Sequence, residues 1–409
     1  MDISSSNTRP VSTPAGWLDR FVASRLRATL DTAKGLAISI RLPSGYRFRV
    51  GDPGADALDW RINRWNTLFR VLNSGALGFA EGYIQQEWDS AALPALLSGL
   101  ANHLDGIETA QARRSPSRFL ARLRHWRNDN TKSGSRRNIA FHYDLGNAFY
   151  ARWLDPSMTY SSAIFEHLDE DLEAAQTRKY RRICERLELK PGQHVLEIGC
   201  GWGGFAEIAA RDFGCRVTGV TLSREQLAFA EARMDAAGLS DQVELRLQDY
   251  RDIEGEFDAI ASIEMFEAVG EAHWDTFFAR ALERLRPGGK ASMQVITIRE
   301  QDFDGYRKAV DFIQKYVFPG GMLPPVSRLE ALAGEAGFET VDRHMFGPSY
   351  AETLRRWHQA YVTAWPELQH QGFDDRFDRI WRFYLAYCEA GFDAGRIDVG
   401  QFTFRKPEA

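Results

Sequence analysis

A glycine-rich turn contains the first residues of this chain that could bind a ligand. The run VLEIGCGWGG (residues 195–204) has glycines at 199, 201, 203 and 204, and the carboxylate of Glu197 lies two residues before the first of them. Glycine allows a ligand to approach the backbone closely, and the carboxylate could bind an ammonium group, such as that of a methionine-derived cofactor. No Lys-Ser/Thr pair follows, so a phosphate loop is not indicated. Alone, the turn is also compatible with a dinucleotide site or a tight structural turn.

Polar residues at two later strand ends favour a nucleoside ligand. The run from Val220 to Ser223 is followed by Glu225 and Gln226, about 20 residues after the glycine turn, where such sheets contact a ribose. The next predicted strand ends near Asp249 and Tyr250, an acid for an adenine amine and a ring for stacking. Each feature alone is commonly a solvated loop. Together with the turn they predict an S-adenosylmethionine site.

The segments that must position these residues alternate between strand and helix patterns. Short apolar runs occur at 194–200, 215–222, 243–249, 257–264 and 291–298, and helical patterns separate most of them. This alternation predicts an α/β fold with a parallel sheet, whose ligands bind at the carboxyl ends of the strands. Residues 1–110 contain a strand-like run at 36–42 and helical spacing at 66–72, which indicates a smaller, mainly helical N-terminal domain.

Composition limits the possible function classes. The 409 residues, 44% hydrophobic, suffice for two or three domains, and the net charge of −5 does not indicate a nucleic-acid partner. The four cysteines show no CxxC pair or metal-ligand spacing, so we expect a reducing cytoplasm and no metal site. No apolar run has the length of a signal peptide or a transmembrane helix, so any membrane contact should be peripheral.

A basic amphipathic segment separates the two predicted domains. Residues 112–138 contain nine Arg or Lys against the single acid Asp129, and Phe119, Leu123 and Trp126 recur among them at helical spacing. One interpretation is a solvated interdomain helix. The other is a contact with an anionic membrane surface, worth about 1 kcal/mol per basic residue. The sequence favours neither. We predict domains at 1–110 and 138–409, with residues 111–137 as the linker.

Longer motifs resemble the cyclopropane-fatty-acyl-phospholipid synthases and the related mycolic acid methyltransferases. The matching stretches are HYDLGN (142–147), LDPSMTYSSA (154–163), VLEIGCGWGG (195–204), GVTLSREQ (219–226), MFEAVG (265–270), FIQKYVFPGG (312–321), YAETL (350–354) and YLAYCEAGF (384–392). The run VLNSGALGFAEGY (71–83) looks like an amino-terminal element that the mycolic acid enzymes lack, which points to the phospholipid branch.

The resemblance implies a Rossmann-like class I methyltransferase domain with a helical cap for the acyl chain and an unsaturated membrane phospholipid as substrate, and it is compatible with a homodimer. The resemblance also implies which positions contact S-adenosylmethionine. These are Tyr160, Ser161, Glu197, Gly199, Cys200, Gly201, Gly203, Thr221, Leu222, Ser223, Gln226, Gln248, Asp249 and Tyr250.

The same resemblance implies a second set of residues for the chemistry. An alkene is a weak nucleophile, so its attack on a sulfonium methyl needs water exclusion and alignment, and it leaves a carbocation that must lose a proton. The family usually holds a bicarbonate ion as the base. The positions that match its ligands are Ser162, Glu267, Gln294, Ile296 and Tyr350. Cys388 matches a further cysteine, which is either a nucleophile or a buried packing residue.

Two of these positions depart from the family pattern. Ser162 stands where cysteine is usual, and Gln294 stands where histidine is common; an amide donates a hydrogen bond but does not titrate near neutral pH. Bicarbonate could still bind with fewer charged partners, Glu267 could itself be the base, or the cation could be resolved without a ring. We therefore expect cyclopropanation, with C-methylation as the alternative. A non-catalytic regulator that binds S-adenosylmethionine is a third hypothesis.

Overall fold

The computed structural model describes residues 15–31, 33–103 and 145–408. The chain divides into two compact units, Met1–Ser117 and Arg118–Ala409. The predicted basic segment at 112–138 and the first three residues of HYDLGN lie outside the described residues. Within the described ranges, no helix has the length and apolar character needed to cross a bilayer.

The N-terminal unit combines a mixed sheet with three described helices. Its elements are α1 (Trp17–Leu30), β1 (Ala37–Arg41), β2 (Arg47–Gly51), β3 (Ala57–Ile62), α2 (Asn66–Ile84), β4 (Trp88–Asp89) and α3 (Leu93–Ala101). The strands have the order β2-β1-β3-β4. Ile38 and Ile40 of β1 are buried while Ser39 between them is exposed, as the two-residue period of a half-buried strand requires. The sequence predicted one strand here, and the structure has four.

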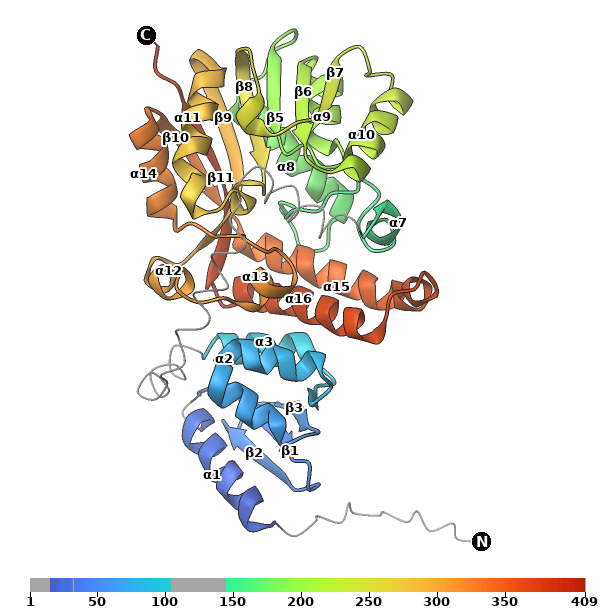
Figure 1. Ribbon diagram of the computed structural model, residues 1–409, viewed down its shortest axis with the longest axis vertical. Helices are drawn as coiled ribbons and strands as arrows, with labels where there is room; N and C mark the ends of the chain where they lie inside the picture. Colours follow the sequence, from blue (N-terminus) through green and yellow to red (C-terminus); the bar gives the residue numbers. More distant parts are fainter. Residues whose placement is uncertain (1–14, 32, 104–144, 409) are drawn as a thin grey trace. The chain divides into compact units, whose positions relative to one another are not determined.

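The C-terminal unit is built on a seven-stranded sheet of order β10-β11-β9-β8-β5-β6-β7 (Figure 1). The strands are β5 (His194–Ile198), β6 (Arg216–Thr221), β7 (Val243–Leu247), β8 (Phe257–Ile263), β9 (Leu285–Ile298), β10 (Glu339–Met345) and β11 (Ile397–Arg405). The central strands β9, β8, β5, β6 and β7 are parallel, which confirms the predicted α/β class. The antiparallel strands β10 and β11 were not predicted.

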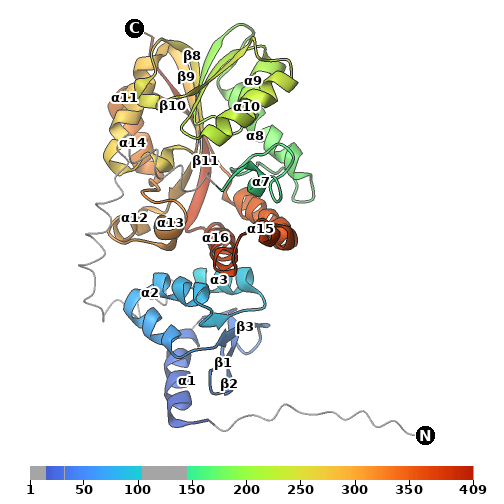
Figure 2. The same cartoon turned by 45° about the vertical axis from the view of Figure 1, so that its right-hand side comes forward.

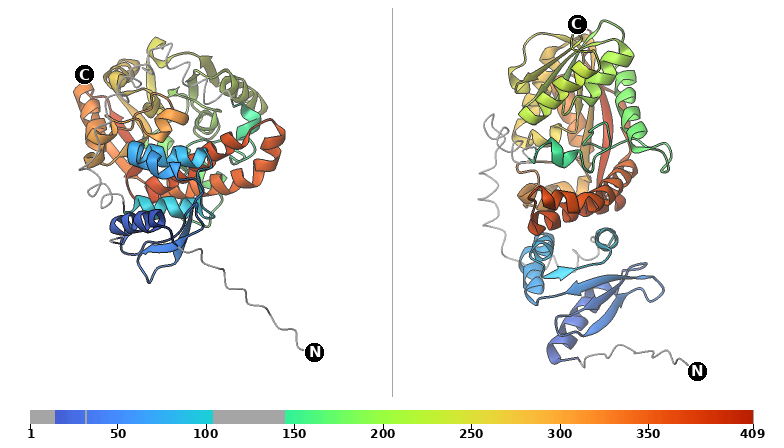
Figure 3. Two further views of the ribbon diagram at one scale, coloured as in Figure 1. Left: turned by 60° about the horizontal axis from the view of Figure 1, so that its bottom comes forward. Right: turned by 90° about the vertical axis from the view of Figure 1, so that its right-hand side faces the viewer.

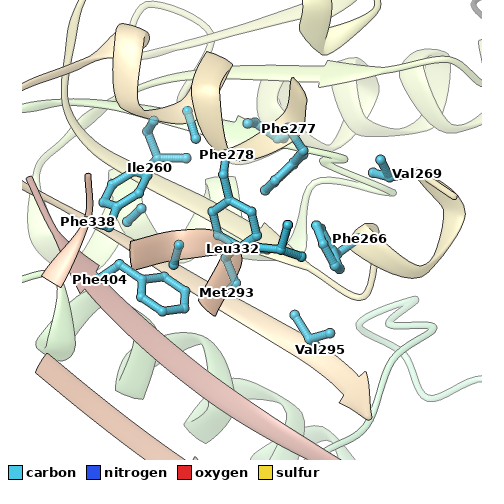
Figure 4. Packing of buried hydrophobic residues seen from close by; sticks show 14 of the residues in the cluster. Ile260, Phe266, Val269, Phe277, Phe278, Met293, Val295, Leu332, Phe338 and Phe404 are labelled. Atoms are coloured by element: carbon cyan, nitrogen blue, oxygen red, sulfur yellow. The ribbon is translucent and has the colours of Figure 1, made fainter. Parts of the chain in front are cut away.

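Helices cover both faces of this sheet. Figure 2 shows α11 (Trp274–Arg284) and α14 (Val326–Ala336) on one face, and α8 (Leu172–Arg186), α9 (Gly204–Phe213) and α10 (Arg224–Ala236) on the other. On the first face Phe277 and Phe278 of α11 pack with Ile260, Phe338 and Phe404 (Figure 4). On the second, Ile183, Phe205 and Val217 belong to another buried cluster. Each aromatic or branched side chain buried in this way contributes about 1.5–3 kcal/mol, so the two clusters hold the sheet rigid beneath its ligand edge.

A group of helices lies across the end of the sheet where the parallel strands terminate. The long helices α15 (Gly347–His370) and α16 (Asp375–Asp393) run side by side there, as Figures 1 and 3 both show, and α13 (Phe312–Tyr316) packs on α16. The remaining short helices are α7 (Asn147–Tyr150), α12 (Glu300–Tyr306), η2 (Tyr250–Asp252), η3 (Phe266–Ala268) and η4 (Glu271–His273). Residues from α15 and α16 can therefore meet residues at the ends of β8 and β9.

Candidate active site

The glycine turn after β5 is fixed by its neighbouring strand and by a left-handed backbone. The N–H groups of Gly199 and Cys200 both donate to the carbonyl of Val220 at 3.0 Å. Gly199 has φ of +85°, and a Cβ there would lie 2.7 Å from Cγ of Met265. Only glycine meets both conditions. Around Gly201 a Cβ would meet no atom within 4 Å, so this side of the turn is open to a ligand.

Glu197 is a buried carboxyl group beside this turn. Its side chain is 2% exposed, and its Oε2 makes no hydrogen bond within the described structure. Burial raises the pKa of Glu197 well above its usual value, and the charge of Arg233 only partly opposes that rise. A buried carboxyl with an unused oxygen fits a ligand that supplies an ammonium group. Glu197 therefore has a free oxygen with which it could accept from the ammonium group of a ligand at this turn.

The predicted ribose and adenine residues lie at the ends of β6 and β7, on the same edge of the sheet. Thr221 Oγ1 donates to Gln226 Oε1 at 2.9 Å, and Ser223 Oγ caps α10 by accepting from the Gln226 N–H. Leu222 between them is partly exposed. These contacts hold the loop after β6 in one shape. Three of the predicted cofactor residues thus also stabilise one another.

At the end of β7, Asp249 is buried and forms an ion pair of 2.7 Å with Arg251. The ring of Tyr250 packs on Phe277 with centroids 5.4 Å apart, and Gln248 donates to the carbonyl of Asp252. The ring of Tyr250 is thereby held by the core, while Asp249 already has a charged partner.

Tyr160 and Ser161 lie beside an aromatic wall that reaches the glycine turn, because the ring of Tyr150 packs on both Tyr160 and Trp202. The hydroxyls of Tyr160 and Tyr384 are 2.7 Å apart, and the ring of Tyr160 lies 5.3 Å from that of Trp357. Trp153 and Trp357 are almost completely buried. A wall of this kind excludes water and presents ring faces, which attract a cation by about 2 kcal/mol or more when desolvated. Of three other rings in this unit, Tyr350 packs on Phe392 and Phe318 on Tyr384, whereas Tyr316 packs on Phe312.

A second buried centre forms around Glu264, directly after β8. Its Oε1 accepts hydrogen bonds from the Ser162 N–H at 2.8 Å and from Gln294 Nε2 at 2.7 Å. Its Oε2 accepts from the Tyr350 hydroxyl at 2.6 Å. The five positions implied as bicarbonate ligands do come together here. Sequence reasoning missed Glu264 itself, although an acid at the last position of a predicted parallel strand was a usable signal.

The donors at this centre do not fit a bicarbonate ion, because protein carboxylates already occupy them. Ser162 N–H, Gln294 and Tyr350 bond to Glu264, and the Ile296 N–H donates to Glu267 Oε1 at 2.5 Å. The Ser162 hydroxyl donates instead to the Ala163 carbonyl. Glu267 Oε2 has no hydrogen-bond partner within the described residues. Burial and the nearby Glu264 charge raise the pKa of Glu267 to about 8.

Lys179 of α8 supplies a positive charge to this centre. The side chain is fully buried, and its Nζ donates to Ser161 Oγ at 2.5 Å. Burial lowers the pKa of Lys179 to about 7, although the charges of Glu264 and Asp155 oppose the shift. The same desolvation raises the pKa of Glu264, and the charge of Lys179 opposes that change. The sequence signal was a lysine on the buried stripe of an amphipathic helix.

Gln294 is held by a chain of amides behind it. Gln401 Nε2 donates to Gln294 Oε1 at 3.1 Å, and Arg182 donates to Gln401 Oε1 at 3.0 Å. Because its oxygen accepts from Gln401, the amide nitrogen of Gln294 must point at Glu264. The glutamine at this position therefore acts as a fixed donor.

Cys388 of α16 is partly buried, and burial raises the pKa of its thiol. A thiol in such surroundings does not form the thiolate that a nucleophile requires. The packing interpretation of Cys388 is the one its environment favours. No His, Cys, Asp or Glu cluster suited to a metal ion occurs in the part of the chain that the structure describes.

Comparisons with known proteins agree on one family. A model described as mycolic acid cyclopropane synthetase matches residues 130–402. The chain is 38% identical over 392 residues to the tuberculostearic acid methyltransferase UfaA1 of Mycobacterium tuberculosis, covering 91% of this chain and 88% of that protein. It is also 38% identical over 361 residues to the cyclopropane-fatty-acyl-phospholipid synthase of Escherichia coli, covering 86% of this chain and 89% of that protein.

Solved structures give the same result for the C-terminal unit. The cyclopropane synthase MmaA2 from Mycobacterium tuberculosis aligns with a TM-score of 0.63 and 32% identity, over 66% of this chain and 98% of that one. The mycolic acid cyclopropane synthase CmaA1, complexed with SAH and CTAB, aligns with a TM-score of 0.62 and 30% identity, over 66% and 98%.

Proposed function

Because this chain belongs to the mycolic acid cyclopropane synthetase family, we propose that it adds a one-carbon unit to the double bond of an unsaturated phospholipid acyl chain and closes a cyclopropane ring. At the coarser level, the chain is an S-adenosylmethionine-dependent methyltransferase of the lipid-modifying kind, with a Rossmann-like α/β fold. The identity of the acceptor and the ring closure are the finer part of the proposal.

One observation carries the choice of a phospholipid acceptor. The relative named as a phospholipid synthase matches 86% of this chain, whereas the structure of the mycolic acid cyclopropane synthase CmaA1 covers 66%. The longer match extends beyond the C-terminal unit, which begins at Arg118. A region shared with the phospholipid enzyme and absent from the mycolic acid enzymes supports the same acceptor class here.

The residues of the site suit the first step of this reaction. S-adenosylmethionine, when bound, supplies an electrophilic methyl group. Glu197 would hold its ammonium group and Asp249 its adenine amine, so that the cofactor spans the ends of β5 and β7. The rings of Tyr160, which is partly exposed, and of the buried Trp153 and Trp357 would exclude water and face the cation that the acyl chain acquires. A membrane acceptor also requires peripheral contact with a lipid surface, which we assign to the basic segment at 112–138.

The product identifies the function directly. Expression in a bacterium that lacks cyclopropane lipids, with methyl-labelled methionine, should add the mass of one CH₂ group to unsaturated phospholipid chains, measured by mass spectrometry. Nuclear magnetic resonance should then show ring methylene protons. A mass gain without ring protons would mean C-methylation. The Mycobacterium tuberculosis relative is named as a methyltransferase. If the protein binds the cofactor but the phospholipids gain no mass, a non-catalytic role remains.

Replacing Glu197 with glutamine tests the assigned cofactor contact. The amide keeps the shape of the side chain but cannot balance an ammonium charge, so we expect S-adenosylmethionine to bind about 10- to 100-fold more weakly. The free protein should be as stable as the wild type or more stable, because burial opposes the charged form of Glu197. Isothermal titration calorimetry and urea unfolding measure the two quantities. The exposed Glu231→Gln is the control; equal affinities for both variants would remove Glu197 from the cofactor site.

A further inference from the structure

We propose that the carboxylate of Glu264 takes the place of the bicarbonate ion used by the family and is the base that removes the proton from the lipid cation. This inference rests on the proposed function, since it assigns the proton acceptor for that reaction. The chain would then carry its own anion, and its turnover would not require one from solution.

The hydrogen bonds around Glu264 are the first argument. Donors from three separate parts of the chain converge on this one side chain: the Ser162 N–H, the Gln294 amide and the Tyr350 hydroxyl, at 2.8, 2.7 and 2.6 Å. All three belong to positions that the resemblance assigned to an external anion. A free anion would have to displace a protein carboxylate that is covalently held beside the same donors. The site is therefore preorganised around Glu264.

The backbone of Glu264 gives an independent argument. Its φ is +48°, in the left-handed region. Glycine adopts this backbone conformation without strain, whereas residues with a Cβ adopt it rarely. Its N–H donates to the Gln294 carbonyl at 2.8 Å, which fixes this conformation at the end of β8. Residues with a strained backbone persist where the surrounding structure holds them in that conformation, and they cluster at active sites. Glycine would fit this backbone better, so the carboxylate itself requires an explanation.

The charges distinguish Glu264 from Glu267, the other buried carboxyl group of the centre. Glu264 has three side-chain and backbone donors and the charge of Lys179, whereas Glu267 accepts from the Ile296 N–H and faces the negative charge of Glu264. The negative charge of the pair is therefore best held on Glu264. Two carboxyls whose surroundings separate their protonation in this way commonly divide the roles of base and neutral acid.

The step balances without a further reactant. The alkene electron pair forms a C–C bond to the methyl carbon as the C–S bond breaks and its electrons remain on sulfur, which leaves a cation on the acyl chain. Glu264 then takes a proton from the added methyl group, and the electron pair of that C–H bond closes the ring. The proton is later released from the Glu264 carboxyl to solvent.

The wild-type enzyme gives the first test. Turnover in buffer purged of carbon dioxide should be the same, within twofold, as turnover with added bicarbonate. A stimulation of tenfold or more by bicarbonate would overturn the proposal while leaving the proposed function intact. A wild type with no lipid product under either condition would instead refute the proposed function.

Variants of Glu264 give the second test. Glu264→Gln should lower turnover by about 10²- to 10⁴-fold, the usual contribution of a positioned base, while S-adenosylhomocysteine still binds in calorimetry. Glu264→Gly relieves the strain of the left-handed backbone and leaves the donors free. Added bicarbonate or formate should therefore raise the turnover of this variant at least tenfold over its turnover without added anion. Glu267→Gln keeps the Glu264 carboxylate on its donors, so added bicarbonate or formate should not raise its turnover. Full turnover in Glu264→Gly without added anion would overturn the assignment.

Discussion

Replacing Lys179 with methionine is expected to lower the free energy of unfolding by about 3 kcal/mol at pH 7 and to reduce turnover by about 100-fold. Methionine keeps the length of the side chain but not its charge. Glu264 and Asp155 would then remain buried without their cation, and removing one partner from a set of buried charges is strongly destabilising. Loss of the Lys179 charge would raise the pKa of Glu264 further, so a smaller fraction of its carboxyl group would be ionised and able to accept a proton.

Urea unfolding and single-turnover lipid assays measure these two effects. The double variant Lys179→Met with Glu264→Gln should recover most of the lost stability, because no unpaired carboxylate is left at Glu264. It should remain inactive. The exposed Lys190→Met is the control and should change stability by no more than about 0.5 kcal/mol. If Lys179→Met matched that control in stability and rate, Lys179 would not be the partner of Glu264.

The cofactor edge could be predicted from the sequence because its signals are local. Each parallel strand is a short apolar run, and the residues after it, such as Glu197, Gly199 and Asp249, occupy positions that the sheet topology alone brings to one edge. The left-handed φ of Gly199 agrees with that local reading. Periodicity and turn chemistry were sufficient there.

The second centre could not be predicted in the same way, because its contacts join distant parts of the chain. The Tyr350 hydroxyl meets Glu264 across 86 residues, and the Ser162 N–H meets it across 102. Lys179 lies in the run Arg178-Lys-Tyr-Arg-Arg182, whose charge suggests a solvated helix face. Its helical spacing to Ala175 and Ile183 is the one contrary signal, and the packing of α8 bears that signal out: this lysine points into the protein while Arg181 remains half exposed.

The strands β10 and β11 were missed for a related reason. Strand β11 pairs with β9 over its whole length and brings Gln401 opposite Gln294. That register orients the Gln294 amide toward Glu264, through a contact between residues 107 positions apart. Position 294 was interpreted from its match to a family position and from the chemistry of an amide. The neighbour that determines which end of the amide faces the site is set by sheet pairing.

Replacing Glu267 with glutamine is expected to stabilise the protein increasingly as pH rises, by roughly 2–4 kcal/mol at pH 8. The folded-state pKa of Glu267 is raised from 4.5 to about 8. The stability tied to its protonated form is therefore fully present below pH 4.5 and is lost as pH rises toward 8, because the unfolded chain releases this proton first. Glutamine has no titratable proton, so the variant should not lose this contribution to the free energy of unfolding between pH 4.5 and 8.

Lys179 contributes with the opposite sign and at higher pH. Its folded-state pKa is lowered from 10.5 to about 7, so the unfolded chain holds more protons between those values and stability rises with pH there. This contribution is common to the wild type and Glu267→Gln, and it cancels in their difference. Unfolding free energies of both proteins at pH 5, 7 and 8 should therefore diverge steadily, whereas those of the exposed Glu256→Gln should stay parallel to the wild type. A constant difference for Glu267→Gln would mean that Glu267 is already ionised at pH 5, which would also remove the basis for placing the negative charge on Glu264 alone.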